Sequence, residues 1–274
     1  MSTGDNGHRS LRFPPGLVSA WKQTQPWIPK ILALVVVLYP LYYGLIERPP
    51  SESEVPIELR LTAFTIILPT GLGLWFYPKL SLSFRILLLF ILSAWTVEML
   101  TVMQSAQKIQ GYLYFQIYTF IEFGSLMLIF SMWQSKPRLQ RLLIFTVVIV
   151  TAVLLILKIY RSESGENFDT LASTIESLVL VAAALLTLIS LTSENITFVF
   201  SNPRFWVVSA VLIYFAGTVI LFSLVNWVLK VQPDVWITVH SALNGTANLL
   251  YAYAFYCQYR YSRSLASSQW KQTE

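Results

Sequence analysis

The sequence is poor in charged residues. Lys, Arg, Asp and Glu together make up 12% of its 274 residues, whereas hydrophobic residues make up 55%. An ordinary soluble domain is about one quarter charged. The chain therefore carries more apolar side chain than a single core can use, and the excess must meet another apolar phase. This composition predicts an integral membrane protein in contact with the lipid bilayer.

Cysteine and histidine are also scarce. The single cysteine, Cys257, excludes an intrachain disulfide and a cysteine-based metal site. Of the two histidines, only His240 falls within a predicted span, which excludes a histidine-rich zinc site. A site of two glutamates and one histidine stays open as a less favoured alternative. We therefore predict neither a metal nor a cofactor.

Several sequence motifs are missing as well. The chain has no G-x-S-x-G, no Walker A and no H-E-x-x-H, which argues against the hydrolases and nucleotide-binding proteins that use them. No lysine lies inside the last predicted span, so a retinal Schiff base there is excluded. The net charge of +5 is not gathered into a basic run with interleaved aromatics, so no nucleic-acid partner is expected.

Long apolar segments are what the chain has in abundance. Several approach or exceed the roughly 18–20 residues that cross a bilayer. The eight predicted spans cover residues 29–46, 60–78, 86–104, 112–133, 142–159, 171–192, 205–229 and 235–258. The breaks between them carry proline, glycine or charge. The predicted fold is all-α, a polytopic transmembrane helical bundle of eight spans.

The spans divide into an anchor and a core. We predict a cytoplasmic tail over 1–28, a retained anchor span at 29–46, a seven-helix core over 60–259 and a second cytoplasmic tail over 260–274. No small-residue cleavage site follows the first span, which favours retention over a signal peptide. The connections leave no room for a soluble domain, and the C-terminal tail is too short to fold alone.

Orientation follows from the lysines and arginines. Most of the 19 precede the first span, follow the last, or lie in the second, fourth and sixth connections. The first and fifth connections instead collect acidic residues. By the positive-inside rule both termini are cytoplasmic. The expected location is a bacterial inner membrane.

Ionisable residues interrupt the apolar spans at a few positions. Glu98, Glu122, Glu176 and His240 each lie within a different span. A charged side chain at the bilayer centre costs roughly 2.5–3.5 kcal/mol on insertion scales, so it normally faces a partner or a wet cavity. At 1.5 Å per residue, Glu122 lies about 15 Å deep and the other three about 8 Å below the outer surface. Asn226 lies shallower, so all are expected in the outer half.

Helical spacing places polar partners beside these residues. Tyr118 lies four positions before Glu122, and His240, Asn244 and Asn248 recur every four positions on one face of the last span. The predicted ligand-binding residues are Glu122, Glu176, His240, Glu98, Tyr118, Asn244, Asn248 and Asn226. The plainer interpretation is that such residues only hydrogen-bond neighbouring helices, for roughly 0.6 kcal/mol each. For His240 both interpretations stay open.

Five stretches carry a resemblance to a known family. They are "WTVEML", "IYTFIEF", "STIESLVL", "NPRFWVVSAVLIYFAGTVILFSL" and "VHSALNGTANLLYAYAFYC". In this order, over about residues 60–259, they resemble an uncharacterised bacterial family of seven-helix integral membrane proteins. Some similar seven-helix modules precede histidine kinases, so the resemblance implies a sensory role by analogy. This chain adds an N-terminal span and ends without a kinase.

These observations lead to a functional hypothesis with open alternatives. The chain is expected to be a membrane sensor or signalling component that binds a small ligand or protons in an outer-half polar cavity. Its output would then pass through a separate signalling protein. The alternatives are an intramembrane enzyme acting on lipid or isoprenoid, a small proton-coupled transporter, and a purely structural bundle.

Overall fold

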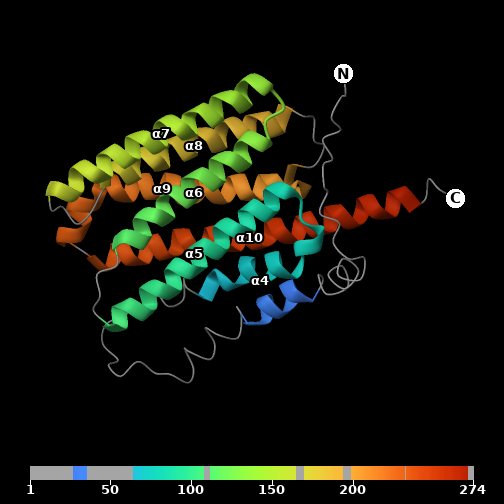
Figure 1. Ribbon diagram of the computed structural model, residues 1–274, viewed down its shortest axis with the longest axis horizontal. Coiled ribbons are helices and arrows are strands. Elements are labelled where there is room, and N and C mark those ends of the chain that lie inside the picture. Colours follow the sequence, from blue (N-terminus) through green and yellow to red (C-terminus); the bar gives the residue numbers. More distant parts are fainter. Residues whose placement is uncertain are drawn as a thin grey trace, which may run out of the picture.

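The computed structural model describes residues 27–35, 64–107, 112–164, 170–193, 199–231 and 233–270 (Figure 1). Within these ranges the regular elements are all helical, and the predicted all-α class is confirmed. The labelled helices are α4 (Ile67–Trp75), η1 (Tyr77–Lys79), α5 (Leu82–Gln107), α6 (Tyr112–Met132), α7 (Pro137–Ser164), α8 (Thr170–Ser193), η2 (Val199–Ser201), α9 (Pro203–Val231) and α10 (Pro233–Trp270). A further short helix covers residues 28–35.

The helices follow the predicted spans but extend beyond several of them. Helix α7 begins at Pro137, five residues before the expected start at 142, because proline is well suited to the first helical position. Helix α10 continues into the expected tail as far as Trp270, since residues 259–270 contain no glycine or proline. Most of the predicted anchor span at 29–46 lies outside the described residues.

Within the described part of the chain, three helices are long and apolar enough to cross a membrane. These candidate spans are Pro137–Leu157 in α7, Leu171–Ser193 in α8 and Pro203–Leu224 in α9. A shorter apolar stretch, Ile117–Met132, lies in α6. In α10, polar residues such as His240 and Asn244 lower the hydropathy. The structure thus supports a membrane-associated helical bundle, while the full set of eight spans stays a prediction.

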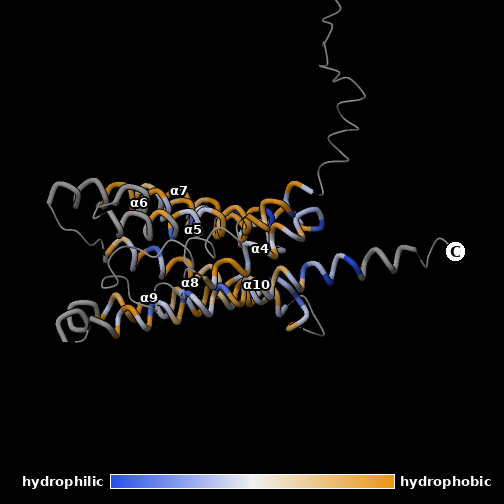
Figure 2. Tube along the Cα trace, turned by 90° about the horizontal axis from the view of Figure 1, so that it is seen from below, coloured by the Kyte–Doolittle hydropathy of each residue, from blue (hydrophilic) through white to orange (hydrophobic). Residues whose placement is uncertain are grey.

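The long helices pack in two layers. Figure 2 shows α5, α6 and α7 in one layer and α8, α9 and α10 in the other. Within the layers α6 packs against α5 and α7, and α9 packs against α8 and α10. Contacts of α6 and α7 with α8, and of α4 with α10 and α5, join the layers. Helix α9 therefore lies between α8 and α10, a position that matters for the site below.

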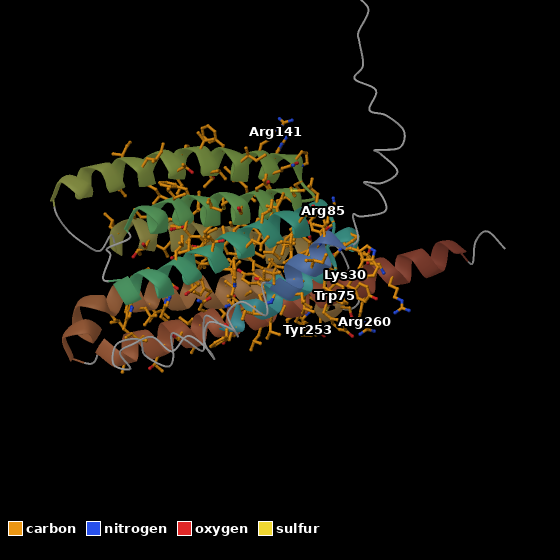
Figure 3. The ribbon with its side chains drawn as sticks, turned by 60° about the horizontal axis from the view of Figure 1, so that its bottom comes forward. Lys30, Trp75, Arg85, Arg141, Tyr253 and Arg260 are labelled. Atoms are coloured by element: carbon orange, nitrogen blue, oxygen red, sulfur yellow. The ribbon has the colours of Figure 1, made fainter. Side chains whose placement is uncertain are left out.

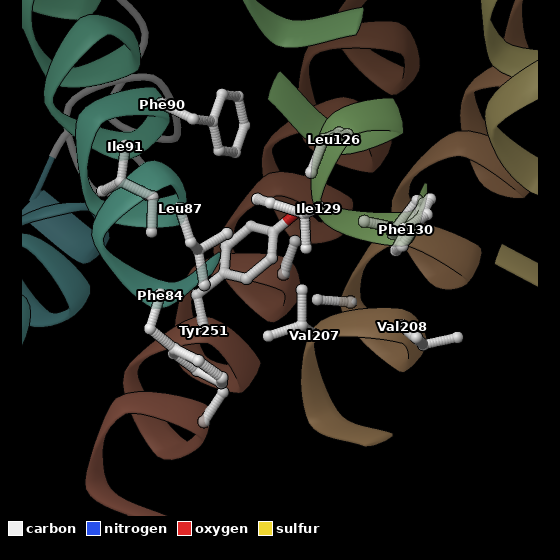
Figure 4. Close-up of a cluster of buried hydrophobic side chains, with 14 of the residues drawn as sticks. Phe84, Leu87, Phe90, Ile91, Leu126, Ile129, Phe130, Val207, Val208 and Tyr251 are labelled. Atoms are coloured by element: carbon white, nitrogen blue, oxygen red, sulfur yellow. The ribbon is translucent and has the colours of Figure 1, made fainter. Parts of the chain in front are cut away.

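Large apolar side chains fill the space between the layers. The close-up in Figure 4 shows residues of α5, α6, α9 and α10 meeting around the ring of Tyr251. Phe84 meets the ring of Phe255 edge-on at 5.9 Å, and Phe90 meets that of Tyr251 edge-on at 6.1 Å. These ring contacts determine which face of α5 packs against α10. The polar side chains of the same helices are thereby held in register.

Lysine and arginine side chains gather at one end of the bundle, which we call the basic end. Figure 3 shows Lys30, Arg85, Arg141 and Arg260 there. The basic end is where α5, α7 and α9 begin and where α6 and α8 finish. Helix α10 also passes through it and projects beyond the neighbouring helices (Figure 1). The second, fourth and sixth predicted connections, which carry most of these cations, therefore lie at the same end of the bundle.

Candidate functional site

Glu122 lies midway along α6 and bonds within its own helix. The hydroxyl of Tyr118, one turn earlier, donates a hydrogen bond to Oε1 of Glu122 at 3.0 Å. The Tyr118 ring also stacks on Phe90 of α5, with centroids 6.4 Å apart. Apolar packing against α5 therefore holds the ring whose hydroxyl orients the carboxylate. The predicted polar stripe on this helix forms as expected from the spacing of four.

Tyr214 of α9 lies within electrostatic range of three glutamates that belong to three other helices. Its phenol interacts electrostatically with Glu122 of α6, Glu98 of α5 and Glu176 of α8. The same hydroxyl lies within electrostatic reach of Tyr118. Three carboxylates far apart in the sequence thus share one tyrosine, because α9 lies between α8 and α10 and faces the other layer. We call Glu98, Glu122, Glu176, Tyr118, Tyr214 and His240 the Tyr214 cluster.

His240 joins the cluster through ring contacts. Its imidazole lies against the ring of Tyr214, with centroids 5.9 Å apart and planes inclined by 59°. On its own helix it stacks on Trp236, at 6.5 Å and 2°. The imidazole therefore contacts both an indole of its own helix and the phenol of Tyr214. This contact attaches α10 to the cluster.

A chain of hydrogen bonds links the cluster to α10 a second time. Asn248 Nδ2 donates to Thr65 Oγ1 at 3.0 Å and to Asn244 Oδ1 at 3.4 Å. Asn244 Nδ2 in turn donates to Oε1 of Glu98 at 3.4 Å. The two asparagines share a face of α10 because they are four residues apart. These hydrogen bonds connect Thr65, just before α4, to the two asparagines of α10 and, through Asn244, to Glu98 of α5.

The cluster is only partly enclosed. Glu176 is buried, whereas Glu98, Glu122, Tyr214 and His240 keep part of their surface accessible. At 1.5 Å per residue, Glu122 lies about 15 Å from the α6 terminus at the basic end, and Glu98 about 24 Å from the start of α5. The cluster therefore occupies the middle of the bundle and the half away from the basic end.

Charges within this part of the bundle are of one sign. Every lysine and arginine with a described side chain lies at the basic end. The described acidic side chains are Glu98, Glu122 and Glu176, and all three belong to the cluster. A buried charge is normally compensated by an opposite one. Within the described structure, hydrogen bonds from Tyr118 and Asn244 provide part of that compensation.

Seven of the eight predicted site residues belong to these interactions. Glu98, Glu122, Glu176, His240 and Tyr118 are cluster members, and Asn244 and Asn248 form the connected chain. The side chain of the eighth, Asn226, lies outside the described part of the structure. Whether these residues bind a ligand stays a prediction, because their arrangement alone does not identify one.

Sequence reasoning missed Tyr214, the residue that connects the others. It lies in the apolar stretch "VSAVLIYFAGTVILF", where a tyrosine resembles any other membrane aromatic. Thr218, one turn later, donates its hydroxyl to the Tyr214 carbonyl oxygen at 2.7 Å, so even the nearest polar residue bonds locally. Only the position of α9 between its neighbours reveals the role of Tyr214.

A second polar set lies near the basic end. Gln134 was placed in a connection by its sequence, but it is buried and donates from Nε2 to Thr187 Oγ1 at 2.8 Å. Trp133 Nε1 donates to Ser83 Oγ at 3.1 Å, and Ser135 and Ser190 share a hydrogen bond of 3.3 Å. These bonds fold the turn between α6 and α7 onto α5 and α8. The set has no carboxylate, which is typical of helix–helix packing.

A metal site finds no support in the described structure. Among the residues it covers, no group of three or more His, Cys, Asp or Glu side chains is arranged to hold a metal ion.

The comparisons with known proteins found no match: no family model, no curated protein and no solved structure is significantly similar to this chain.

Proposed function

We propose that the chain is a multi-pass protein of a bacterial inner membrane in which the Tyr214 cluster binds protons or a small cationic ligand and acts as a sensor. The single observation that supports this is that Glu98, Glu122 and Glu176, from three different helices, all lie within electrostatic range of Tyr214. Among the described side chains no cation lies near these carboxylates, and an ionised carboxylate without a cation is costly in a medium of low dielectric. A proton or a bound cation removes that cost.

The groups within electrostatic range of Glu122 come from three helices. Tyr118 lies on the same helix, Tyr214 on α9 and Tyr251 on α10. Through Tyr214, Glu122 also shares its surroundings with Glu98 of α5 and Glu176 of α8. Binding one cation therefore changes interactions on five helices at once. A change that is distributed in this way can alter helix packing, as a sensor requires.

Helix α10 favours sensing over the alternatives. It carries His240 and Asn244, which contact the cluster, and it continues to Trp270 beyond the basic end (Figure 1). One rigid element thus connects the cluster to a segment that a separate signalling protein could contact. We therefore propose that occupancy of the cluster shifts α10 and that the partner reads this shift.

A label on the projecting part of α10 tests the proposal. In a Cys257→Ser background, Arg263→Cys places a single thiol on an exposed position of α10. A spin label there, in protein reconstituted into lipid nanodiscs, is expected to report a pH-dependent change in mobility. The change should be displaced or lost in Glu122→Gln. The matched control is Lys136→Gln, an exposed position far from the cluster.

Three other results would separate the alternatives. A label that responds identically with and without Glu122→Gln and Glu98→Gln would exclude the cluster as the sensing element. Solute counterflow in liposomes that requires Glu122 would instead indicate a transporter. Turnover of an added lipid that is lost in His240→Ala would indicate an enzyme.

A further inference from the structure

The basic end carries positive charge that the described chain does not neutralise. The cations with described side chains are Lys30, Lys79, Arg85, Lys136, Arg138, Arg141, Arg204, Arg260 and Arg263. The described carboxylates all belong to the Tyr214 cluster, further along the bundle. Within the described ranges, therefore, no ion pair compensates the basic end. Such a surface attracts anions from outside the protein.

Part of this end is built from cations seated on aromatic rings. Lys30 Nζ lies 5.3 Å from the ring centroid of Trp75, and Arg85 Cζ lies 5.2 Å from that of Tyr77. Lys79 Nζ lies 4.7 Å from the ring of Tyr259. We call Lys30, Trp75, Tyr77, Lys79, Arg85 and Tyr259 the aromatic–basic patch. Figure 3 shows Lys30, Trp75 and Arg85 at the same end of the bundle.

The patch is held together from several elements. Trp75, Tyr77 and Lys79 follow one another from the end of α4 through η1. Phe76, between them, stacks on Tyr259 of α10 with centroids 4.3 Å apart and an interplanar angle of 13°. This stack brings the α4–η1 turn against α10 and sets Lys79 over the Tyr259 ring. The cations are therefore positioned by packing and do not move independently.

A ring attracts a cation without cancelling its charge. A cation–π contact contributes about 0.5–1 kcal/mol at an exposed site, and the full positive charge persists. Arg85 adds a specific requirement, because its Nε is buried and finds no hydrogen-bond acceptor among the described residues. A buried donor without an acceptor costs about 1–3 kcal/mol. A phosphate oxygen reaching Arg85 would remove this cost.

We propose that the aromatic–basic patch binds the phosphate head group of an anionic phospholipid. The inference rests on the membrane placement but not on the Tyr214 cluster. Trp75 and Tyr77 are exposed, and exposed tryptophan and tyrosine at the end of a bundle typically lie at the head-group level of a membrane. Basic pockets between helices on the cytoplasmic side bind anionic head groups. A free phosphate ion would use the cations but not the exposed rings.

Native mass spectrometry of the purified full chain tests the proposal. The probes are phosphatidylglycerol and phosphatidylcholine with identical acyl chains, and phosphatidylglycerol is expected to bind more tightly. In Lys79→Gln/Arg85→Gln its affinity should fall about ten- to thirtyfold. The matched control is Arg138→Gln/Arg141→Gln, which removes the same charge from two exposed arginines outside the patch. There the affinity should fall much less.

A second pair keeps the test valid if the Arg85 variant does not fold. Lys79→Gln and Lys136→Gln both replace an exposed lysine, but only Lys79 lies over a ring of the patch. The proposal requires the larger loss in Lys79→Gln. Equal losses in both would show a diffuse charge effect and overturn it, as would equal binding of the two lipids. Inorganic phosphate that displaces the lipid at comparable concentration would overturn the lipid assignment.

Discussion

Asn244 donates a hydrogen bond to Glu98 across the interface of α10 and α5, with 3.4 Å between Nδ2 and Oε1. At this length the bond is weak. It is nevertheless a direct link between a membrane carboxylate and the helix that projects from the basic end. A small movement of α10, or a change in the charge of Glu98, would break or tighten it. The bond is therefore a sensitive part of the proposed coupling.

Coupling between these two side chains can be measured. Glu98→Gln and Asn244→Ala are each expected to lower the thermal stability in detergent, followed by circular dichroism. Their double variant should lose less than the sum, with a coupling of about 0.6 kcal/mol, the average for polar pairs between membrane helices. Thr246→Ala is the control partner, because Thr246 is exposed on α10 and bonds only to its own backbone. Additivity of Glu98→Gln with Asn244→Ala would contradict the contact.

The hydroxyl of Tyr118 should stabilise the fold through Glu122. Tyr118→Phe keeps the ring that stacks on Phe90 but removes the 3.0 Å hydrogen bond to the carboxylate. We expect a loss of about 1–3 kcal/mol in the free energy of unfolding, because a shielded acceptor is left without its donor. Tyr256→Phe, on an exposed tyrosine, should change stability little. A Tyr118→Phe variant as stable as the parent would show that another group satisfies Glu122.

Replacing either of two glycines by alanine is expected to change the stability in opposite directions. A Cβ added to Gly217 of α9 would lie 2.5 Å from Cδ1 and 2.6 Å from Cδ2 of Leu243 on α10. Gly217→Ala should therefore destabilise by about 1–3 kcal/mol through overpacking. At Gly124 of α6 nothing lies within 4 Å of such a Cβ. Gly124→Ala should be neutral or stabilise by up to about 1 kcal/mol, because alanine favours the helix.

The Gly217 prediction has an internal check. Adding Leu243→Ala to Gly217→Ala removes the clashing branch and should recover part of the stability, as measured by the same thermal unfolding. The double variant could instead be less stable than Gly217→Ala by the full cost of the cavity that Leu243→Ala leaves. In that case α9 and α10 do not approach each other as closely as the structure indicates.

The local features of the site could be predicted from sequence. Residues four positions apart share a helix face, and this rule alone indicates the Tyr118–Glu122 pair and the Asn244–Asn248 pair, both of which hydrogen-bond. Apolar run length likewise indicates where the helices lie. These signals are local, because each depends only on residues within a few turns of one helix.

Relations between helices could not be predicted in this way. The role of Tyr214 depends on α9 packing between α8 and α10, and no periodicity in the sequence specifies neighbours. Gln134 lies in the connection between α6 and α7, as its sequence predicts, but its burial depends on a relation between helices too. Its stretch "QSKPRLQR" has the composition of a surface connection, yet Thr187 of α8 accepts a hydrogen bond from its side chain and draws the turn inward.

The Gln134–Thr187 bond gives a further prediction. Thr187→Val keeps the shape of the side chain but removes the oxygen that accepts from Gln134 Nε2 at 2.8 Å. We expect a loss of about 1 kcal/mol in thermal unfolding. Thr192→Val is the control: its hydroxyl bonds only to the Ile189 carbonyl on the same exposed face. Equal effects of the two substitutions would show that the turn is not anchored through Thr187.

The orientation of the chain in the membrane can be tested on helix α7 alone. Arg141 lies at the basic end of α7, and residue 161 lies about 30 Å further along the same helix, which is close to the thickness of the hydrocarbon core. In a Cys257→Ser background, an impermeant thiol reagent applied to intact cells should label Arg161→Cys but not Arg141→Cys. Both should react once the membrane is permeabilised. Labelling of both before permeabilisation would show that α7 does not cross, and labelling of Arg141→Cys alone would reverse the orientation. Arg204→Cys and Lys230→Cys, near the two ends of α9, provide an independent pair in which the second should be the accessible one.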